Sequence, residues 1–157
     1  MKIELWSIGK ENDKHFENAI KLYVDRLKHY TQFDLVTIDN SKINKSLSIA
    51  QILEKEADLI LQKINDKDLL ICLDDKGKHF TSIQFSEKLN QLLSNNTSKI
   101  IFLIGGSYGI ADVLKKKSLF LFSLSNLTFP HQLVRLIFCE QLYRAFSILK
   151  NEKYHHE

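Results

Sequence analysis

The chain contains a glycine-rich stretch, Gly105-Gly106-Ser107-Tyr108-Gly109, whose backbone could contact a ligand. It follows an apolar run and precedes a short helical pattern, so backbone N–H groups can face a bound group there. A tight strand-to-helix turn that binds nothing explains the same residues equally well. The spacing is not the G-x-G-x-x-G of dinucleotide-binding proteins, and the next apolar run carries no acidic residue to bind a ribose. We therefore expect no dinucleotide cofactor.

A second candidate is the segment that joins the next apolar run to the last helix. It consists of Leu124, Ser125, Asn126, Leu127, Thr128 and Phe129. Apolar side chains of such a loop can enclose a flat ring such as adenine, while its backbone groups bond to the ring edge. The alternative is a hydrophobic linker that only packs beneath the last helix. The residues alone favour this simpler interpretation.

Side chains that can move protons or bind anions follow this segment. His131 lies at the start of a helix, where the positive end of the helix dipole disfavours the imidazolium form. It can accept a proton or cap the helix. Arg135 and Arg144 are nine residues apart and so lie on opposite sides of a helix. Arg144 can pair with Glu140 four residues earlier, whereas phosphate contact is favoured for Arg135, which lies nearer the loop.

Alternating strands and helices must position these groups. Strands are predicted at residues 2–8, 33–39, 69–73, 100–104 and 119–124, with a turn at Gly77. Helices are predicted at residues 14–27, 49–64, 81–93, 111–116 and 130–150, and Thr81 and Gln84 have the spacing of a capping box. This alternation predicts a single α/β domain, residues 1–157, with a mostly parallel sheet and helices on both faces.

Ligands of such sheets bind beyond the carboxyl ends of the strands. Three of these ends, Leu73–Asp75, Ile104–Ser107 and Leu124–Phe129, are predicted to meet at one crevice.

The last helix is predicted to be apolar on two sides. One stripe consists of Val134, Phe138, Leu142, Ala145 and Leu149, and the other of Leu133, Ile137 and Ile148. A helix that is apolar on both sides must be buried on both sides. In a chain of this size we expect the second cover to be another copy, which makes the protein a homodimer.

Composition narrows the class of protein. Hydrophobic residues make up 44% of the 157 and charged residues 26%, which is typical of globular proteins. No apolar run reaches the roughly 20 residues of a membrane span, and the N-terminus lacks a signal peptide. Cys72 and Cys139 lie in apolar runs, which indicates buried thiols, no metal site and a cytoplasmic protein.

The net charge of +3 favours a polyanionic partner only weakly, because tight binding of RNA needs several phosphate contacts. An RNA-directed protein of this charge must dimerise or dock on a larger particle. The run Lys115-Lys116-Lys117 is interpreted as a solvated face, with phosphate contact as the alternative.

Three separated motifs, LIGGSYG, SLSNLTFPHQLVRLIFCEQLYRAF and the terminal KYHHE, resemble those of the RlmH family of 23S rRNA pseudouridine methyltransferases. The chain length and the opening MKIELWSIGK match too, so the resemblance covers essentially the whole chain. It implies the SPOUT fold with a deep C-terminal trefoil knot and S-adenosylmethionine as cofactor. It also implies methylation of N3 of a pseudouridine in 23S rRNA on the assembled ribosome.

The resemblance assigns the cofactor contacts to Leu73, Gly105 and the stretch Leu124–Phe129. A side chain at position 105, as in Gly105→Val, is therefore expected to enter the space of the bound cofactor. It also makes the terminal pair Tyr154 and His155 part of the active site. Many relatives carry a basic residue after that pair, whereas this chain has His156.

The imide nitrogen of the implied substrate must lose a proton, so a base or an anion-stabilising cation is needed. The catalytic candidates are His131, Arg135, Tyr154 and His155. The last helix is about 30 Å long at 1.5 Å per residue, so the tail is expected to reach a partner's site more easily than its own. Removal of the tail, residues 154–157, is expected to leave stability nearly unchanged.

Two alternative functions stay open: a SPOUT enzyme acting on another RNA such as tRNA, and a catalytically silent ribosome-binding module.

Overall fold

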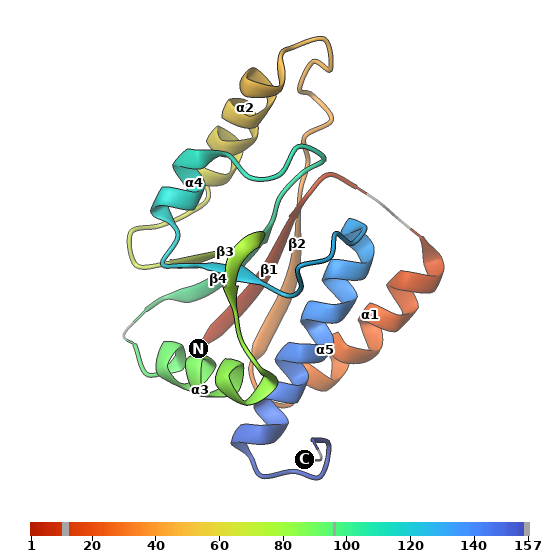
Figure 1. Ribbon diagram of the computed structural model, residues 1–157, viewed down its shortest axis with the longest axis vertical. Coiled ribbons are helices and arrows are strands. Elements are labelled where there is room, and N and C mark those ends of the chain that lie inside the picture. The colour runs from red at the N-terminus through yellow and green to blue at the C-terminus, as the bar shows by residue number, and fades with distance from the viewer. Residues whose placement is uncertain (11–12, 96, 156–157) are drawn as a thin grey trace.

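The computed structural model describes residues 1–10, 13–95 and 97–155. Its strands are β1 (Lys2–Ile8), β2 (Gln32–Ile38), β3 (Leu69–His79), β4 (Lys99–Ile104) and β5 (Leu121–Ser123). Its helices are α1 (Lys14–Leu27), α2 (Ile49–Leu61), α3 (Ser82–Leu93), α4 (Asp112–Lys117) and α5 (His131–Leu149). The strands form one sheet in the order β2-β1-β4-β3-β5, and these neighbours pair in parallel (Figure 1). The predicted α/β fold is confirmed.

Helices cover both faces of the sheet, as predicted. The helices α1, α3 and α5 pack on one face, and α2 and α4 pack on the other (Figure 1). Strand β4 lies at the centre and is buried from Ile100 to Ile104, which is why its sequence is continuously apolar. Its side chains divide between the two cores, with Phe102 on the α5 side and Leu103 on the α2 side.

Polar residues at the helix starts fix where the elements begin. The Thr81 side chain accepts a hydrogen bond from the backbone N–H of Gln84, and the Gln84 side chain accepts one from the backbone N–H of Thr81. The predicted capping box is therefore confirmed. Ser48 and Gln51 form a second capping box at the start of α2.

The predicted turn at Gly77 is wrong, because β3 continues to His79. Its pairing with β5 shifts register between Leu73 and Lys78. A Cβ atom at position 77 would lie 2.6 Å from the carbonyl carbon of Leu121, so only glycine allows the backbone of β5 to approach this closely. The glycine marks a close contact between strands rather than a reversal of the chain.

The last helix has the two apolar sides that the sequence predicts. Phe138, Leu142 and Ala145 are fully buried in the core. Leu133, Ile137 and Ile148, the second stripe, are half-buried. What completes the cover of that stripe stays a prediction.

Both cysteines are buried, as predicted. Burial raises the pKa of the Cys72 thiol to about 11 and that of Cys139 to about 12, so both stay protonated at neutral pH. Among the helices that the structure describes, none combines the length and apolar character needed to cross a bilayer.

Candidate active site

The carboxyl ends of β4 and β5 and the middle of β3, where its pairing with β5 shifts register, border one cleft, called here the strand-end cleft. Its lining residues come from these segments and from the start of α5: Leu73, Asp74, Asp75, Ile104, Gly105, Gly106, Gly109, Ile110, Phe122, Leu124, Ser125, Leu127, Thr128, Phe129, His131 and Val134. The cavity volume is about 190 Å³, and the cleft opens to solvent. The three segments that the sequence singled out do converge, but Leu73–Asp75 lies within β3 and not at its end, because the strand continues to His79.

The glycine turn forms one wall of this cleft. The backbones of Gly106 and Gly109 bond to each other in both directions, at 3.2 and 3.0 Å, which closes the turn. Gly109 has a φ of +86°, a conformation that favours glycine. A Cβ at position 105 would lie 2.4 Å from the carbonyl oxygen of Gly109. The expectation for Gly105→Val is therefore corrected: the side chain would distort the turn itself rather than project into the ligand space.

The loop from Leu124 to Phe129 forms the opposite wall. Its Ser125 side chain accepts a hydrogen bond from the backbone of Leu127 at 3.0 Å, and its Ser125 carbonyl accepts one from Ser123 at 2.9 Å. These bonds curl the loop so that Leu127 lines the cleft while remaining 69% exposed. Asn126 is the one residue of the loop that does not line it. An exposed leucine at the mouth of a cleft is suited to cover an apolar ligand.

A buried ion pair lies at the edge of the cleft and was not predicted as part of the site. Lys115 donates to Asp74 at 2.6 Å, and the Asp74 side chain is 9% exposed. Burial works against the charged form of Asp74, but the bonds from Lys115 and the backbone of Lys76 outweigh it and lower the pKa of the carboxyl. Lys115 is thus no part of a free solvated face. The position of Asp74 directly after the apolar run of residues 69–73 was the available signal.

The two candidates on α5 differ in position. His131 lines the cleft from the first turn of the helix. Arg135, one turn further along, does not line it. The structure thus brings His131, but not Arg135, to the residues that the resemblance assigns to the cofactor.

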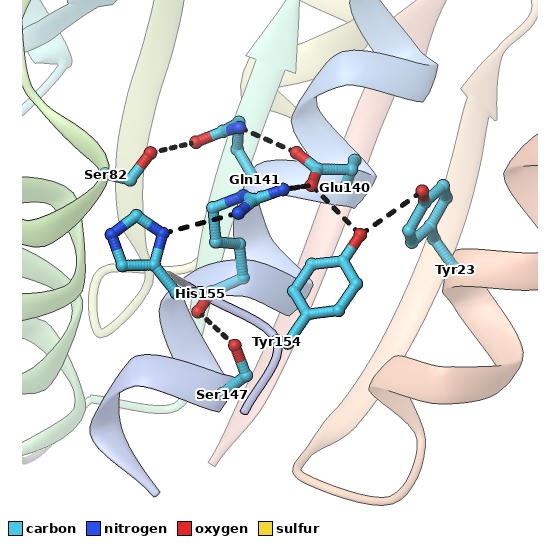
Figure 2. A network of polar contacts seen from close by, with 8 residues as sticks. Tyr23, Ser82, Glu140, Gln141, Ser147, Tyr154 and His155 are labelled. Atoms are coloured by element: carbon cyan, nitrogen blue, oxygen red, sulfur yellow. Dashed lines mark hydrogen bonds and ion pairs between the residues drawn. The ribbon is translucent and has the colours of Figure 1, made fainter. Parts of the chain in front are cut away.

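The terminal pair lies elsewhere, in a group of polar side chains called here the tail network (Figure 2). The network consists of Tyr23, Ser82, Glu140, Gln141, Arg144, Ser147, Tyr154 and His155. Glu140 is its centre, because its carboxylate accepts hydrogen bonds from three side chains: Gln141 at 2.6 Å, Arg144 at 2.5 Å and Tyr154 at 3.1 Å. The pairing of Glu140 with Arg144 is confirmed.

The tail is anchored more firmly than the sequence indicated. The Tyr154 ring packs edge-on against Tyr143 with centroids 4.6 Å apart, and its hydroxyl lies 3.4 Å from that of Tyr23 on α1. Tyr30 donates a hydrogen bond to Glu152 just before it. These contacts hold the tail against its own chain, so the expectation that its removal leaves stability unchanged no longer holds. His156 lies outside the described residues.

The environment of the pair constrains its protonation. Burial, the bond with Tyr23 and the nearby Glu140 raise the pKa of the Tyr154 phenol, so it stays protonated at neutral pH. Arg144 lies 3.3 Å from Nδ1 of His155. A guanidinium can only donate, so in this contact Nδ1 accepts and the proton of a neutral ring lies on Nε2.

The tail network and the strand-end cleft face different sides of α5. Glu140 follows His131 by nine residues, which corresponds to about 14 Å along the axis and half a turn around it. The tail folds back to the level of Glu140 and not to the cleft. Within the described residues, no group of three or more His, Cys, Asp or Glu side chains could hold a metal ion.

Comparison with known proteins points to one family. The profile of a family described as predicted SPOUT methyltransferase matches residues 1–155. The ribosomal RNA large subunit methyltransferase H of Flavobacterium psychrophilum is 48% identical over 157 residues, the whole of both chains. That of Streptococcus mutans is 42% identical over 158 residues, covering 99% of each chain.

The structure is also similar to a probable methylase family protein from Haemophilus influenzae, with a TM-score of 0.56 and 13% identity, over 99% of this chain and 70% of that one. At this identity the likeness shows the fold alone. The profile match and the full-length relatives go further, and the chain belongs to the SPOUT methyltransferase family.

Proposed function

We propose that this protein transfers a methyl group from S-adenosylmethionine to N3 of a pseudouridine in the 23S rRNA of the assembled ribosome. The observation that carries the proposal is the strand-end cleft. It gathers Leu73, Gly105 and most of the loop Leu124–Phe129, the residues to which the family resemblance assigns the cofactor. The full-length relatives named for ribosomal RNA methylation support the substrate class. The modest net charge of +3 fits docking on a particle better than binding of free RNA.

The cleft fits S-adenosylmethionine in chemical character. Phe122, Leu124, Leu127 and Val134 offer an apolar lining for adenine, and the two turns offer backbone groups for its edge. When bound, the cofactor would supply a methyl group on a sulfonium. The chain's own task is then alignment of the two reactants, which can lower a barrier by roughly 7–11 kcal/mol.

A group of the protein has to accept the proton on N3 of the pseudouridine. The candidate residues lie in two places, at the strand-end cleft and in the tail network. His131 borders the cleft in its own chain. The raised pKa of Tyr154 makes this phenol a donor or a stacking platform rather than a base. His155 lies against the Arg144 guanidinium, which can also stabilise negative charge on the base as the proton leaves. Arg135 would act on a phosphate of the rRNA.

We further propose a homodimer in which the tail network of one chain completes the strand-end cleft of its partner. The two regions face different sides of α5, so a second copy is the simplest way to join them. The half-buried stripe of Leu133, Ile137 and Ile148 is the proposed contact. Ile137→Glu should then dissociate the dimer in sedimentation experiments, because it would bury an unpaired charge. A wild-type protein that sediments as a monomer at micromolar concentration would contradict this arrangement.

The deep trefoil knot, in which the C-terminal segment threads through a loop, belongs to the same proposal, as does action in the cytoplasm, where ribosomes are found.

Mass spectrometry of 23S rRNA from a deletion strain tests the function. The expected result is loss of one methyl group from one pseudouridine, restored by the wild-type gene. Loss of a methyl group from tRNA instead would point to another substrate. Unchanged RNA, together with no calorimetric signal for S-adenosylmethionine, would point to a silent ribosome-binding module.

A further inference from the structure

A second cavity adjoins the glycine turn and is called here the turn cavity. Gly105, Gly106 and Gly109 line the strand-end cleft, whereas Ser107 and Tyr108 of the same turn line the turn cavity. Its volume is about 550 Å³, and its remaining wall comes from Lys10 after β1, from the segment after β2 and from α2. The glycine turn therefore contributes residues to both the turn cavity and the proposed cofactor site. None of the contacts assigned above to the cofactor uses it.

The turn cavity contains a buried carboxylate with an unmet hydrogen-bonding atom. Glu56 on α2 is 3% exposed, and its Oε1 accepts a hydrogen bond from Asn40 at 2.8 Å. Within the part of the chain that the structure describes, its Oε2 has no hydrogen-bond partner. Burying a carboxylate oxygen without a donor is unfavourable, so the position calls for an N–H or O–H group from a ligand.

This carboxylate lies against the glycine turn. A Cβ atom at position 106 would be 2.9 Å from Oε1 of Glu56 and 3.0 Å from Oε2. Gly106 is thus in direct contact with both cavities, through its backbone to the strand-end cleft and through Glu56 to the turn cavity. A ligand bound to Glu56 would lie next to the cofactor site.

The rim of the turn cavity supplies two other kinds of group. The Tyr108 side chain is 52% exposed and offers an aromatic face. Lys10 and Lys45 are exposed cations on the same rim. Asp39 also lines the cavity, and its carboxylate accepts a hydrogen bond from the backbone of Ser41. These groups match the parts of a nucleotide. The acceptors inside the cavity match the N–H donors of a base, the exposed aromatic ring matches its π-face, and the cations on the rim match its phosphate.

We propose that the turn cavity binds a nucleotide of the substrate RNA next to the one that is methylated. Its base stacks on Tyr108 and donates from its amino-bearing edge to Glu56, while Lys10 and Lys45 contact the backbone phosphates. The proposal rests on the proposed function, since it takes the substrate to be RNA. Single-stranded RNA can be held in this way because its unstacked bases can be splayed out, stacked on aromatic side chains and bonded at their edges.

The test uses the full-length protein and ribosomes isolated from a strain that lacks its gene. Tyr108→Ala, Lys45→Glu and Glu56→Gln are compared with wild type for methyl transfer, for ribosome co-sedimentation and for affinity toward S-adenosylmethionine by calorimetry. Lys63→Glu is the matched control, because Lys63 is an exposed lysine just beyond the far end of α2. Thermal unfolding of each variant verifies the fold.

We expect Tyr108→Ala and Lys45→Glu to raise KM for ribosomes on the order of tenfold and to weaken co-sedimentation equally, since stacking on one base contributes about that much. Affinity for S-adenosylmethionine and the behaviour of Lys63→Glu should stay within twofold of wild type. Glu56→Gln should also raise KM, because an amide NH₂ cannot accept the bond from the base.

If the wild type is active and the folded variants Tyr108→Ala and Lys45→Glu have an unchanged KM for ribosomes, the inference is overturned and the proposed function stands. Weakened binding of S-adenosylmethionine in these variants would also overturn it, because the cavity would then serve the cofactor. A wild type that transfers no methyl group refutes the proposed function, and co-sedimentation still tests the nucleotide site.

Discussion

The strand-end cleft and the tail network differ in the kind of group that they present. Glycines and apolar side chains make up much of the cleft lining, and an ion pair between Asp74 and Lys115 lies at its edge. The tail network consists of polar and charged side chains that meet at the Glu140 carboxylate (Figure 2). The first region is suited to recognise shape and the second to handle charge and protons.

The difference teaches how this chain divides its chemistry. The two regions are joined by α5, and His131 and Glu140 lie about 14 Å apart along its axis and half a turn around it. In the proposed dimer, each region completes the other only across the two chains. Variants should therefore separate cofactor binding from methyl transfer. The predictions below test this separation.

Removal of residues 154–157 should have the largest effect. It removes Tyr154 and His155, and methyl transfer to ribosomes should fall at least about 100-fold, the scale of a lost acid–base group. Affinity for S-adenosylmethionine should stay within twofold. The lost packing of Tyr154 on Tyr143 should lower the free energy of unfolding by about 1 kcal/mol, measured by urea denaturation.

Mixed dimers sharpen this prediction. One chain carries the truncation and the other a cleft that cannot bind the cofactor, as in Gly105→Val, which would distort the glycine turn. If the site is shared between chains, the mixture should regain part of the activity that both parent homodimers lack. Recovery of no activity at all would show that the tail serves its own chain.

Leu127→Ala should affect the strand-end cleft and not the tail network. The exposed leucine loses no packing in the free protein, yet it lines the strand-end cleft. We expect about a tenfold loss of affinity for S-adenosylmethionine by calorimetry, the scale of one buried leucine, with unchanged stability. Leu22→Ala, on a 50% exposed leucine of α1, is the matched control. Equal affinities for both variants and wild type would remove Leu127 from the site.

Glu140→Gln should loosen the tail without removing it. The amide keeps one acceptor but loses the charge that holds Arg144 and orders Tyr154. The free energy of unfolding should fall by about 1–2 kcal/mol, as for hydrogen bonds to a charged group. The rate kcat should fall several-fold while affinity for the cofactor is unchanged. A loss of cofactor affinity instead would show that the two regions are not separate.

Tyr23→Phe should have the smallest effect. It removes a hydroxyl that lies 3.4 Å from Tyr154 but keeps the ring beside Tyr143. A long hydrogen bond of this kind contributes about 0.5 kcal/mol, so kcat should change by about twofold. Tyr154→Phe, made in parallel, removes the bonds to both Tyr23 and Glu140 and should have the larger effect. A larger fall in kcat for Tyr23→Phe than for Tyr154→Phe would mean that Tyr23 acts on something other than the tail.

Local patterns in the sequence determined the order of the elements and which segments meet at one cleft at the edge of the sheet. The uninterrupted apolar run of residues 100–104 predicted a strand covered on both faces, and Thr81 with Gln84 predicted the start of a helix. Such features depend on neighbours only a few residues away. The motifs and their spacing also predicted the family before the fold was known. The parallel arrangement followed because helices separate the strands.

Only the tertiary structure decided which surfaces touch. Gly77 was interpreted as a turn, but the glycine allows the approach of a strand more than 40 residues later in the chain. Tyr154 is anchored by Tyr23, 131 residues earlier, and Glu56 lies against Gly106 across the sheet edge. These contacts depend on how helices and strands pack, to within an ångström or two. No periodicity along the chain encodes the distance between such elements, because the packing of many side chains together sets it.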